Sequence, residues 1–592
     1  MRTAISTLGL LAGAALLGAC FDPTRPCGTD ADCVSGGTCD PGTKTCVSGS
    51  NPNDKTPPVF SIVIAPPPPR QNTGKLSELD PGSPDGGVDA FRRDESVVVT
   101  VTSADRDVDA GSVQLVVYGV SGNPGTILKV QLGACSASNP NASSPFCGEA
   151  SFPLWPLPFE AFRGVVAIEA SGSDLSNNLG KADAGVNVTR WKWRYSAGAP
   201  IYTTPAIADD GTIVFGTSDG GSGSLYALTP AGGEKWAPVE LGPIKASPVV
   251  GTADGGQQLA YVGTAAGATG NLLAVDLRNG TTVAVCPNGG GSYAGPFVGS
   301  PALVLSGSAS FEGALGIANG SKLVNIRPTA SLADGRCVSI DTVGTQGFPA
   351  NVVASGAQSF AAGSDGTVRA FARQSGIWLD NSTWGGGTGA TVVSNRAVQG
   401  LALSNRLFGS TRLRGAFEVD RGTGALIASY PDGGLTADPG GPVVAESQLF
   451  FADGLSPSPS VLLVADDFAQ GSRIGLPDGV TGSPAVGAGG KIYVTTTAGT
   501  LVTQSVTNGV SWSGSLGATE GVLGSPTLDC GSRDGGSPVT SATGVLYVGS
   551  AAGGLFAILI ESPGLDPTAP WPKYQHDVRN TGNPTTPIQS CP

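Results

Sequence analysis

The stretch TTPAIADDGTIVFGTSDGGSGSLYALTPAGGEKW, residues 203–236, decides how this chain folds. It contains a short apolar run (PAIA), a turn at Asp210-Gly211, a β-rich run (TIVFGT), a glycine loop, a third run (SLYALT) and a last strand that carries Trp236. Short apolar runs interrupted by Gly and Asp favour antiparallel strands over helices. One four-stranded sheet cannot bury both of its faces, so this unit requires neighbouring sheets.

The same pattern recurs along the rest of the chain. Its first strand, PAIA at Pro205, reappears as SPVVG, SPALV, FPANVV, GPVVA, SPAVG and SPTLD, at Pro248, Pro301, Pro349, Pro442, Pro484 and Pro526. A degenerate copy occupies residues 399–419. Pro205 and Pro526 lie 321 residues apart, so seven intervals average about 46 residues each. A period in the forties with four strands per copy is typical of a β-propeller, and we predict eight blades within residues 189–592.

The two ends of the repeat array predict how the ring closes. The segment RWKWRYSAG, residues 190–198, resembles the last strand of the first unit, EKWAPVELG. The eighth unit ends after FAILI, residues 556–560, without such a strand. We therefore predict that residues 191–196 pair with the eighth unit and join the two ends of the ring.

The blade pattern SPAI–DGTIVFGT–GSLYAL–G–W resembles the repeats of the quinoprotein (PQQ-like) β-propeller superfamily. The tail WPKYQHDVRNTG, residues 571–582, is similar to a WPxxxxDxxxTG segment that flanks many of these propellers. The resemblance covers about 400 residues and implies an eight-bladed, WD40-like architecture. The superfamily includes both enzymes and non-enzymes, so the resemblance implies a fold and no particular activity.

The enzymatic branch of that superfamily holds pyrroloquinoline quinone (PQQ) beside calcium, which requires carboxylate and amide ligands. This sequence has no adjacent cysteines, no CxxCH motif and no matching set of Glu, Asn and Asp positions. Its single histidine, His576, lies within the tail motif, where we expect it to hold the tail by hydrogen bonds. A Ser-His-Asp triad would have to use His576, and no GxSxG motif supports one. We expect no catalytic residue, no cofactor and no metal site.

The first twenty residues read as a targeting signal. Arg2 supplies the positive charge, residues 5–17 the apolar core, and Leu17-Gly18-Ala19-Cys20 the end. The core is too short to span a bilayer. Small residues before a cysteine resemble a bacterial lipobox, which implies a signal peptide at residues 1–19 and lipidation, including palmitate, at Cys20. Phe21 in place of an aspartate favours the outer membrane, on its periplasmic face or at the cell surface.

With Cys20 acylated, ten of the eleven cysteines remain, an even number in an exported and oxidising context. We predict disulfides for all ten: Cys27, Cys33, Cys39, Cys46, Cys135, Cys147, Cys286, Cys337, Cys530 and Cys591. The first four lie in residues 20–56, a tether with too few apolar residues for a core, and their pairing stays open. Position along the chain suggests the pairs Cys135–Cys147, Cys286–Cys337 and Cys530–Cys591.

Residues 57–188 predict a second β domain. Strands are expected at residues 60–65, 96–104, 112–120, 126–133, 164–174 and 184–190, a number typical of a sandwich. The segment SADRDVDAGSVQLVVYG resembles the bacterial immunoglobulin-like domains of surface proteins. Asp105, Asp107 and Asp109 alternate, but Ala110 and Val116 stand where an EF-hand needs Gly and Glu. A looser calcium site and a solvated turn both stay open.

The formal net charge of −13 argues against nucleic acid as a partner. The leading hypothesis is a non-enzymatic outer-membrane lipoprotein, held to the membrane by its lipid, whose propeller is a protein- or glycan-binding scaffold. One version of it resembles the propeller lipoprotein of the outer-membrane β-barrel assembly machinery. The alternatives are a PQQ-dependent dehydrogenase of alcohols or sugars and a cell-surface adhesin. The ligand, the membrane face and the oligomeric state stay open.

Overall fold

The structure is a computed structural model of the chain. It describes residues 27, 38–39, 44–47, 55–83, 86–105, 107–119, 124–134, 146–155, 157–253, 256–306, 310–319, 322–328, 336–341, 347–375, 377–387, 389–392, 396–411, 415–430, 440–445, 448–453, 459–465, 467–468, 471–505, 509–531, 543–589 and 591. The predicted signal peptide and Cys20 lie outside these residues. Within the described ranges, no helix is both long and apolar enough to cross a membrane.

The described chain is built of β-strands and divides into two compact units. The first unit comprises residues 1–67, 95–159 and 165–187. One of its sheets has the order β10-β11-β7-β3, with β3 (Phe60–Ile64), β7 (Ser96–Ser103), β10 (Gly133–Ala134) and β11 (Phe146–Pro153). The other contains, in the order β13-β12-β8-β9, the strands β8 (Gln114–Tyr118), β9 (Pro124–Lys129), β12 (Arg163–Ser173) and β13 (Leu179–Thr189). A separate pair, β1 (Thr38–Cys39) and β2 (Cys46–Val47), belongs to the tether.

The two larger sheets of the first unit pack face to face. Buried and exposed residues alternate along β7 and β8, as in a sheet with one face on a core. A side chain at Gly172 on β12 would come within 3.0 Å of Phe60 on β3, so the sheets approach closely there. The sequence predicted most of these strands, but it missed β11. FCGEASFP alternates only weakly, and the sequence predicts a polar loop that ends at Cys147.

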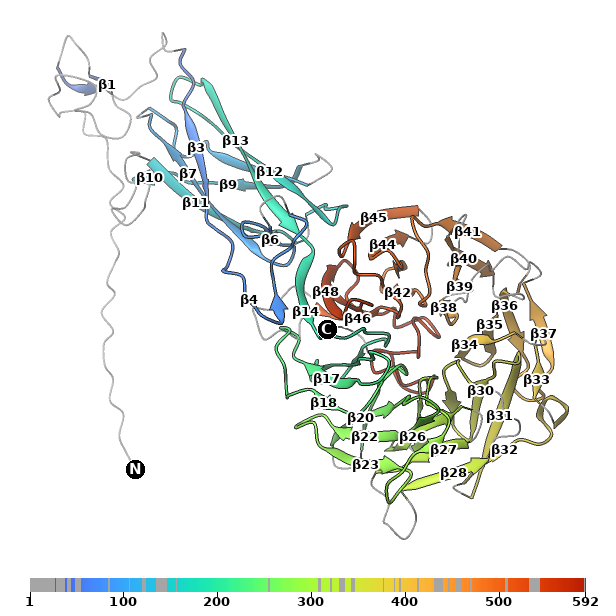
Figure 1. Ribbon diagram of the computed structural model, residues 1–592. Helices are drawn as coiled ribbons and strands as arrows, with labels where there is room; N and C mark the ends of the chain where they lie inside the picture. The colour runs from blue at the N-terminus through green and yellow to red at the C-terminus, as the bar shows by residue number, and fades with distance from the viewer. Residues whose placement is uncertain are drawn as a thin grey trace, which may run out of the picture. The chain divides into compact units, whose positions relative to one another are not determined.

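The second unit comprises residues 68–94, 160–164 and 188–592, and its sheets follow one another around a common centre (Figure 1). In chain order, the first sheets are β15 (Ala206–Ile207), β16 (Ile213–Gly216), β17 (Ser224–Leu228) and β18 (Val239–Glu240); β19 (Val249–Thr252), β20 (Gln258–Gly263), β22 (Leu272–Asp276) and β23 (Thr282–Cys286); and β25 (Ala302–Ser306), β26 (Ser310–Ala318), β27 (Lys322–Ile326) and β28 (Cys337–Asp341). The small pair β21 (Thr269–Gly270) and β24 (Tyr293–Ala294) lies beside the second of these.

The following sheets repeat this arrangement. They are β29 (Val353–Ser355), β30 (Gln358–Ala362), β31 (Thr367–Gln374) and β32 (Ile377–Asp380) with β33 (Ala390–Thr391) and the short 3-10 segment η3 (Trp384–Gly387); β34 (Val398–Leu403), β35 (Leu407–Thr411), β36 (Gly415–Val419) and β37 (Leu426–Ser429); β38 (Val443–Ala445), β39 (Gln448–Asp453), β40 (Ser460–Ala465) and β41 (Gly471–Gly475); and β42 (Ala485–Gly487), β43 (Lys491–Thr495), β44 (Thr500–Ser505) and β45 (Gly509–Ser515). This is a β-propeller. The degenerate copy at residues 399–419 supplies strands like the others.

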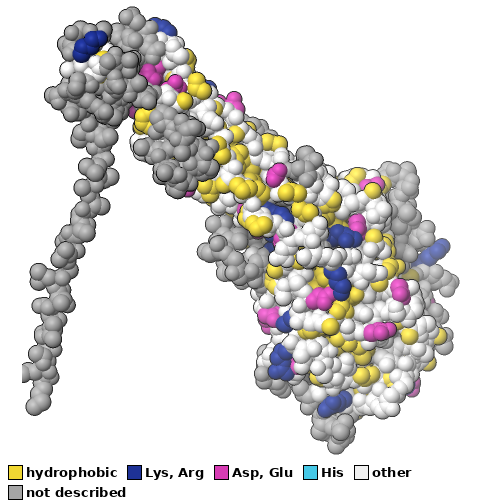
Figure 2. Space-filling model, turned by 60° about the vertical axis from the view of Figure 1, so that its left-hand side comes forward, with side chains coloured by type: hydrophobic (Ala, Val, Ile, Leu, Met, Phe, Trp, Pro, Cys, Tyr) yellow, Lys and Arg dark blue, Asp and Glu magenta, His cyan; other side chains and the backbone are white. Residues whose placement is uncertain are grey.

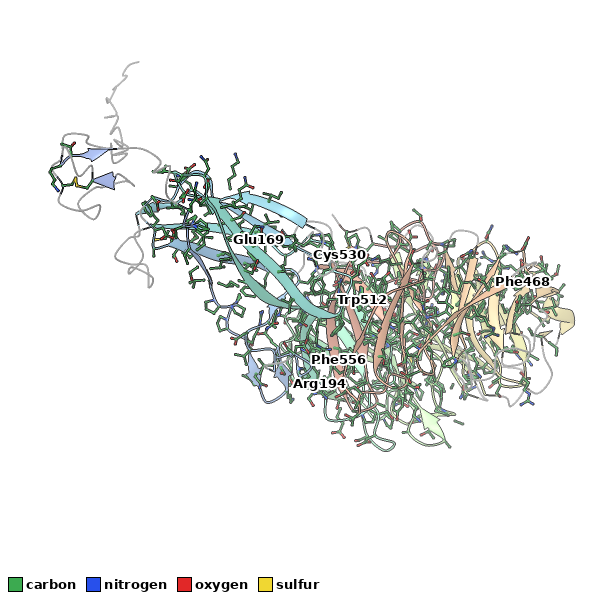
Figure 3. All side chains as sticks on the ribbon, turned by 90° about the horizontal axis from the view of Figure 1, so that it is seen from above. Glu169, Arg194, Phe468, Trp512, Cys530 and Phe556 are labelled. Atoms are coloured by element: carbon green, nitrogen blue, oxygen red, sulfur yellow. A yellow bond between two sulfur atoms is a disulfide. The ribbon has the colours of Figure 1, made fainter. Side chains whose placement is uncertain are left out.

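The last sheet confirms the predicted closure of the ring. β14 (Trp191–Ser196) pairs antiparallel with β48 (Gly554–Ile560), which continues through β47 (Gly544–Gly549) to β46 (Thr527–Cys530). Trp191 packs edge-on against Phe556, with ring centroids 5.6 Å apart. The Arg194 guanidinium lies over Phe556 and bonds Glu520 at 2.7 Å (Figure 3). Backbone pairing, aromatic packing and an ion pair therefore join the two ends of the array.

Residues 68–94 belong to the second unit, although the sequence assigned them to the sandwich. The hairpin of β4 (Asn72–Thr73) and β5 (Leu76–Ser77) pairs with β14 and covers the outer edge of the closing sheet. Asp80 is buried and accepts two hydrogen bonds of 2.6 Å from Arg163. Strand β6 (Phe91–Arg92) pairs in parallel with the end of β13. Long-range pairing of this kind leaves no local signal in such short strands.

Candidate functional site

Most inner strands begin with a hydroxyl residue followed by proline, and these hydroxyls link neighbouring sheets. The amide of Thr204 donates to Ser247 Oγ at 2.9 Å, and the amide of Ser247 donates to Ser300 Oγ at 2.8 Å. The amide of Ser483 donates to Ser525 Oγ at 2.7 Å, and the amide of Ser525 donates to Thr204 Oγ1 at 3.2 Å. The last bond joins the final repeat to the first. The recurring Ser-Pro is therefore a contact between blades.

Glycine precedes that serine where the backbones of two blades come closest. A Cβ added at Gly299 would lie 2.1 Å from the carbonyl oxygen of Ala350. One added at Gly482 would lie 2.3 Å from the carbonyl oxygen of Gly524. Because no real Cβ approaches an oxygen so closely, these two positions exclude any larger residue.

The fourth repeat corrects the position that the sequence assigned to it. The amide of Leu303 donates to the carbonyl of Thr581, and that of Ala354 donates to the carbonyl of Gly582, so these two residues are equivalent. Val352, not Pro349, therefore stands at the proline position of this repeat. Asn351 takes the place of the serine and bonds the backbone of Leu401 with both ends of its amide. The prediction was wrong because a proline three residues earlier imitated the motif.

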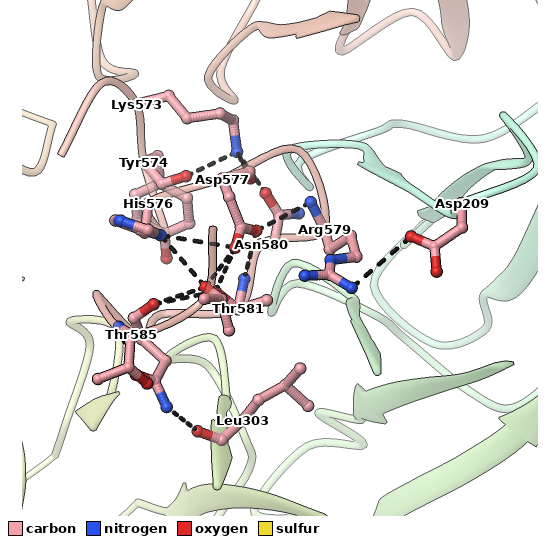
Figure 4. Close-up of polar contacts among 12 residues, drawn as sticks. Asp209, Leu303, Lys573, Tyr574, His576, Asp577, Arg579, Asn580, Thr581 and Thr585 are labelled. Atoms are coloured by element: carbon pink, nitrogen blue, oxygen red, sulfur yellow. Dashed lines mark hydrogen bonds and ion pairs between the residues drawn. The ribbon is translucent and has the colours of Figure 1, made fainter. Parts of the chain in front are cut away.

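The tail at residues 571–583 joins blades that are far apart in sequence (Figure 4). Its backbone carbonyls accept hydrogen bonds from the inner strands at Ile207, Val250, Leu303, Ala354, Val444 and Val486. Asn580 donates from Nδ2 to the carbonyls of Thr204 and Pro248, both at 3.0 Å. Gln575 donates to the carbonyl of Pro301 at 2.7 Å. The tail thus connects six inner strands of the ring.

The titratable groups of the tail are committed to holding it together. Lys573 is fully buried and donates to the carbonyls of Tyr574 at 2.7 Å and Asp577 at 3.1 Å, and also to Asn580 Oδ1. Burial lowers the pKa of Lys573 to about 7. Burial also opposes ionisation of Asp577, but hydrogen bonds and charge from His576 and the charge of Arg579 outweigh it, so the pKa of Asp577 lies below its usual range.

His576 lies inside this cluster. Its ring packs on Trp571 with centroids 5.0 Å apart, and its Nδ1 lies 3.5 Å from Asp577 Oδ2 and 3.4 Å from Thr586 Oγ1. The side chain is buried, with 3% exposed. The structure therefore gives His576 the holding role that the tail motif suggested.

A pocket of about 310 Å³ lies at the centre of the ring, above the tail. We call it the axial pocket. One layer of its wall is the set of hydroxyl positions that link the blades. The second layer lies two residues earlier in the repeats, as in Lys245 before Ser247. Its lining comprises Tyr202, Thr204, Lys245, Ser247, Val298, Pro349, Gln399, Gly440, Gly441, Thr481, Gly482, Ser483, Leu523, Gly524, Ser525 and Tyr574. Tyr574 is contributed by the tail and donates to Ser300 Oγ at 2.9 Å. Sequence reasoning did not single out this pocket, because its lining is assembled from one or a few residues of every repeat.

The axial pocket does not fit PQQ chemistry with calcium. Its lining holds no Asp, Glu, His or Cys, so it offers none of the carboxylates that a hard cation requires. In the described part of the chain, no group of three or more His, Cys, Asp or Glu side chains is arranged to hold a metal.

Two of the three alternating aspartates of the first unit accept hydrogen bonds from backbone amides. Asp109 Oδ1 accepts from the amide of Gly111 at 3.1 Å, and Asp105 accepts from the amide of Val59. Figure 2 shows charged side chains of both signs scattered over the visible face of the second unit.

The predicted disulfide cysteines are paired where they are described. Cys286 bonds Cys337 and Cys530 bonds Cys591, the pairs suggested by position, and Cys27 bonds Cys39. Cys147 is also in a disulfide. Cys20, Cys33 and Cys135 lie outside the described residues, as does the side chain of Cys46.

Comparison with solved structures finds similar chains of low identity. The crystal structure of BamB from Moraxella catarrhalis aligns with a TM-score of 0.38 and 17% identity, over 62% of this chain and 95% of that one. The β-propeller domain of Cps50 (Swd1) from Myceliophteria thermophila aligns with a TM-score of 0.35 and 12% identity, over 52% of this chain and 94% of that one. No family model and no curated relative matches the chain.

Proposed function

We propose that this chain is a non-enzymatic lipoprotein of the outer membrane, anchored through Cys20, whose propeller is a binding scaffold for an envelope protein or glycan. We further propose that the propeller has eight blades and that the sandwich is immunoglobulin-like. The composition of the axial pocket carries the functional part of this proposal. A pocket that presents hydroxyls, amides and one lysine, without a carboxylate or imidazole, can bind a ligand but lacks an acid–base pair.

The charged side chains of the tail interact with other groups of the tail, which supports the same proposal. Lys573, Asp577 and His576 are buried. Lys573 donates to the carbonyl of Asp577 and His576 contacts the Asp577 carboxylate, so none of the three is available to a substrate. A ring closed by backbone pairing and spanned by the tail is rigid. Rigid rings that hold loops and pockets in place are well suited to recognition.

The proposal is tested with the full chain expressed with its signal. Chemical crosslinking followed by capture from detergent-solubilised envelope should recover a stoichiometric protein or glycan partner. The Cys20→Ala variant should move from the membrane fraction to the soluble fraction. Recovery of no partner contradicts the scaffold, and oxidation of alcohols or sugars by the chain supplied with PQQ and calcium contradicts its non-enzymatic nature.

A further inference from the structure

Three hydroxyls of the axial pocket accept a backbone hydrogen bond while their own hydrogen stays free. Ser247, Ser525 and Thr204 each accept a backbone N–H from the preceding blade. Within the described ranges, none of these three donates its own hydrogen to the protein. A hydroxyl has one hydrogen to donate, so each presents a donor that the fold leaves unused.

The Ser483 hydroxyl is also unused by the fold. Its side chain is 2% exposed and lines the pocket, yet its Oγ has no hydrogen-bond partner among the described residues. A buried hydroxyl without a partner is costly, and water or a ligand normally satisfies it. Because the fold gains nothing from this hydroxyl, its use lies in the pocket.

Lys245 adds the one charge in the lining. It is exposed, and within the described chain it forms no ion pair. Its ammonium has three donors and no acceptor. The pocket therefore combines a positive charge with unused donors, although the whole chain carries a formal charge of −13.

We propose that the axial pocket binds a small carboxylate, of the size and shape of a sugar acid. Unused donors favour a ligand rich in oxygen acceptors, and the lysine selects a negative one. The volume of about 310 Å³ is at the lower end for ligand pockets, so the ligand is small. Tyr202, 37% exposed at the same wall, offers a ring face against which a sugar ring packs. This inference deepens the proposed scaffold function and rests on it.

The experiment uses titration calorimetry on the Cys20→Ala chain with glucuronate, sulfate and glucose. Glucuronate should bind, and uncharged glucose of equal size should bind at least about tenfold more weakly, since hydrogen bonds to charged groups are about twice as strong as neutral ones. An oligosaccharide ending in glucuronate separates a glycan terminus from a free acid: tighter binding than the monomer assigns the former, equal or weaker binding the latter. Sulfate binding as tight as that of glucuronate overturns the assignment to a carboxylate.

Two variants locate the binding. Lys245→Gln should weaken glucuronate binding by about tenfold or more, and Ser483→Ala by about threefold or more. The Ser483 hydroxyl bonds to nothing in the fold, so Ser483→Ala should melt at the wild-type temperature. Lys129→Gln on β9, an exposed lysine of the first unit, makes the same charge change and should leave binding unaltered. Wild-type affinity in either pocket variant overturns the proposal. Loss of carboxylate binding with envelope capture intact would refute this inference and leave the scaffold standing.

Discussion

Replacing Asn580 with alanine should destabilise the propeller by about 3–7 kcal/mol. Asn580 is fully buried and bridges the first two repeats through the carbonyls of Thr204 and Pro248. Alanine leaves both carbonyls without that donor, at about 1–3 kcal/mol for each buried group left unsatisfied. It also removes an acceptor from buried Lys573. The φ of Asn580 is +57°, where alanine is disfavoured by about a further 1 kcal/mol.

Three comparisons separate these contributions. Asn580→Gly relieves the backbone cost but still loses the bridge, so it should destabilise by about 1 kcal/mol less than alanine. Asn580→Asp keeps an acceptor for Lys573 but turns a carboxylate oxygen toward two carbonyls, and should be at least as harmful as alanine. Asn177 also has a positive φ, of +63°, but is exposed in a turn of the first unit. Asn177→Ala should therefore cost only the backbone contribution.

The measurement is urea unfolding followed by tryptophan fluorescence, with the midpoint and the slope fitted for each variant. A loss below about 1 kcal/mol for Asn580→Ala at an unchanged slope would show that the tail does not hold the ring together. If Asn580→Gly and Asn580→Ala lose the same stability, the backbone contribution is refuted, while the contribution of the hydrogen-bonded bridge still stands.

Three further perturbations test the closure and the tail. Cys591→Ser opens a disulfide that spans 61 residues, and should lower stability by about 4 kcal/mol from chain entropy, with Cys530→Ser giving the same loss in melting temperature. The fold lowers the pKa of Asp577, so its contribution to stability is complete above the unfolded pKa of about 4 and is lost as pH falls through the folded pKa. The Asp577→Asn variant should therefore be less stable than the wild type at pH 7. Its melting temperature should also fall less steeply at acid pH. Arg194→Gln leaves buried Glu520 without its cation and should cost about 2 kcal/mol. An equal loss in Lys181→Gln, whose ion pair is exposed, would contradict a special role for the closure.

The propeller could be predicted from the sequence because its blades repeat the same local pattern of strands and turns. The Pro205 repeat needs the same turn, the same small residue and the same hydroxyl in most copies, so the period is visible without any long-range information. The pairing of residues 191–196 was also predictable. The array has one extra strand at its start and lacks one strand at its end, so the extra strand completes the last sheet and closes the ring. Its pairing with β48 follows from that count.

The contacts that break the repeat could not be predicted. The hairpin at residues 72–77 pairs with β14 over more than a hundred residues, and its strands of two residues each carry no periodic signal. The fourth repeat was misplaced because Pro349 satisfied the motif while Asn351 supplied its chemistry by another route. A side chain that performs the same role with different atoms is invisible to pattern comparison.

The candidate site combines positions that the repeat makes predictable with positions that it does not. A ligand on the axis of a ring contacts one equivalent position from each blade, and identical side chains there would give it no preferred orientation. Positions that hold the blades together, such as Gly482 and Ser525, are fixed by close approach and by hydrogen bonds. The positions just before them are not, and there the repeats place Tyr202, Lys245 and Leu523. One lysine among otherwise uncharged residues is enough to direct a negative group to one side of the ring. Specificity in a repeat protein is therefore to be sought at the positions where the repeat is free to differ.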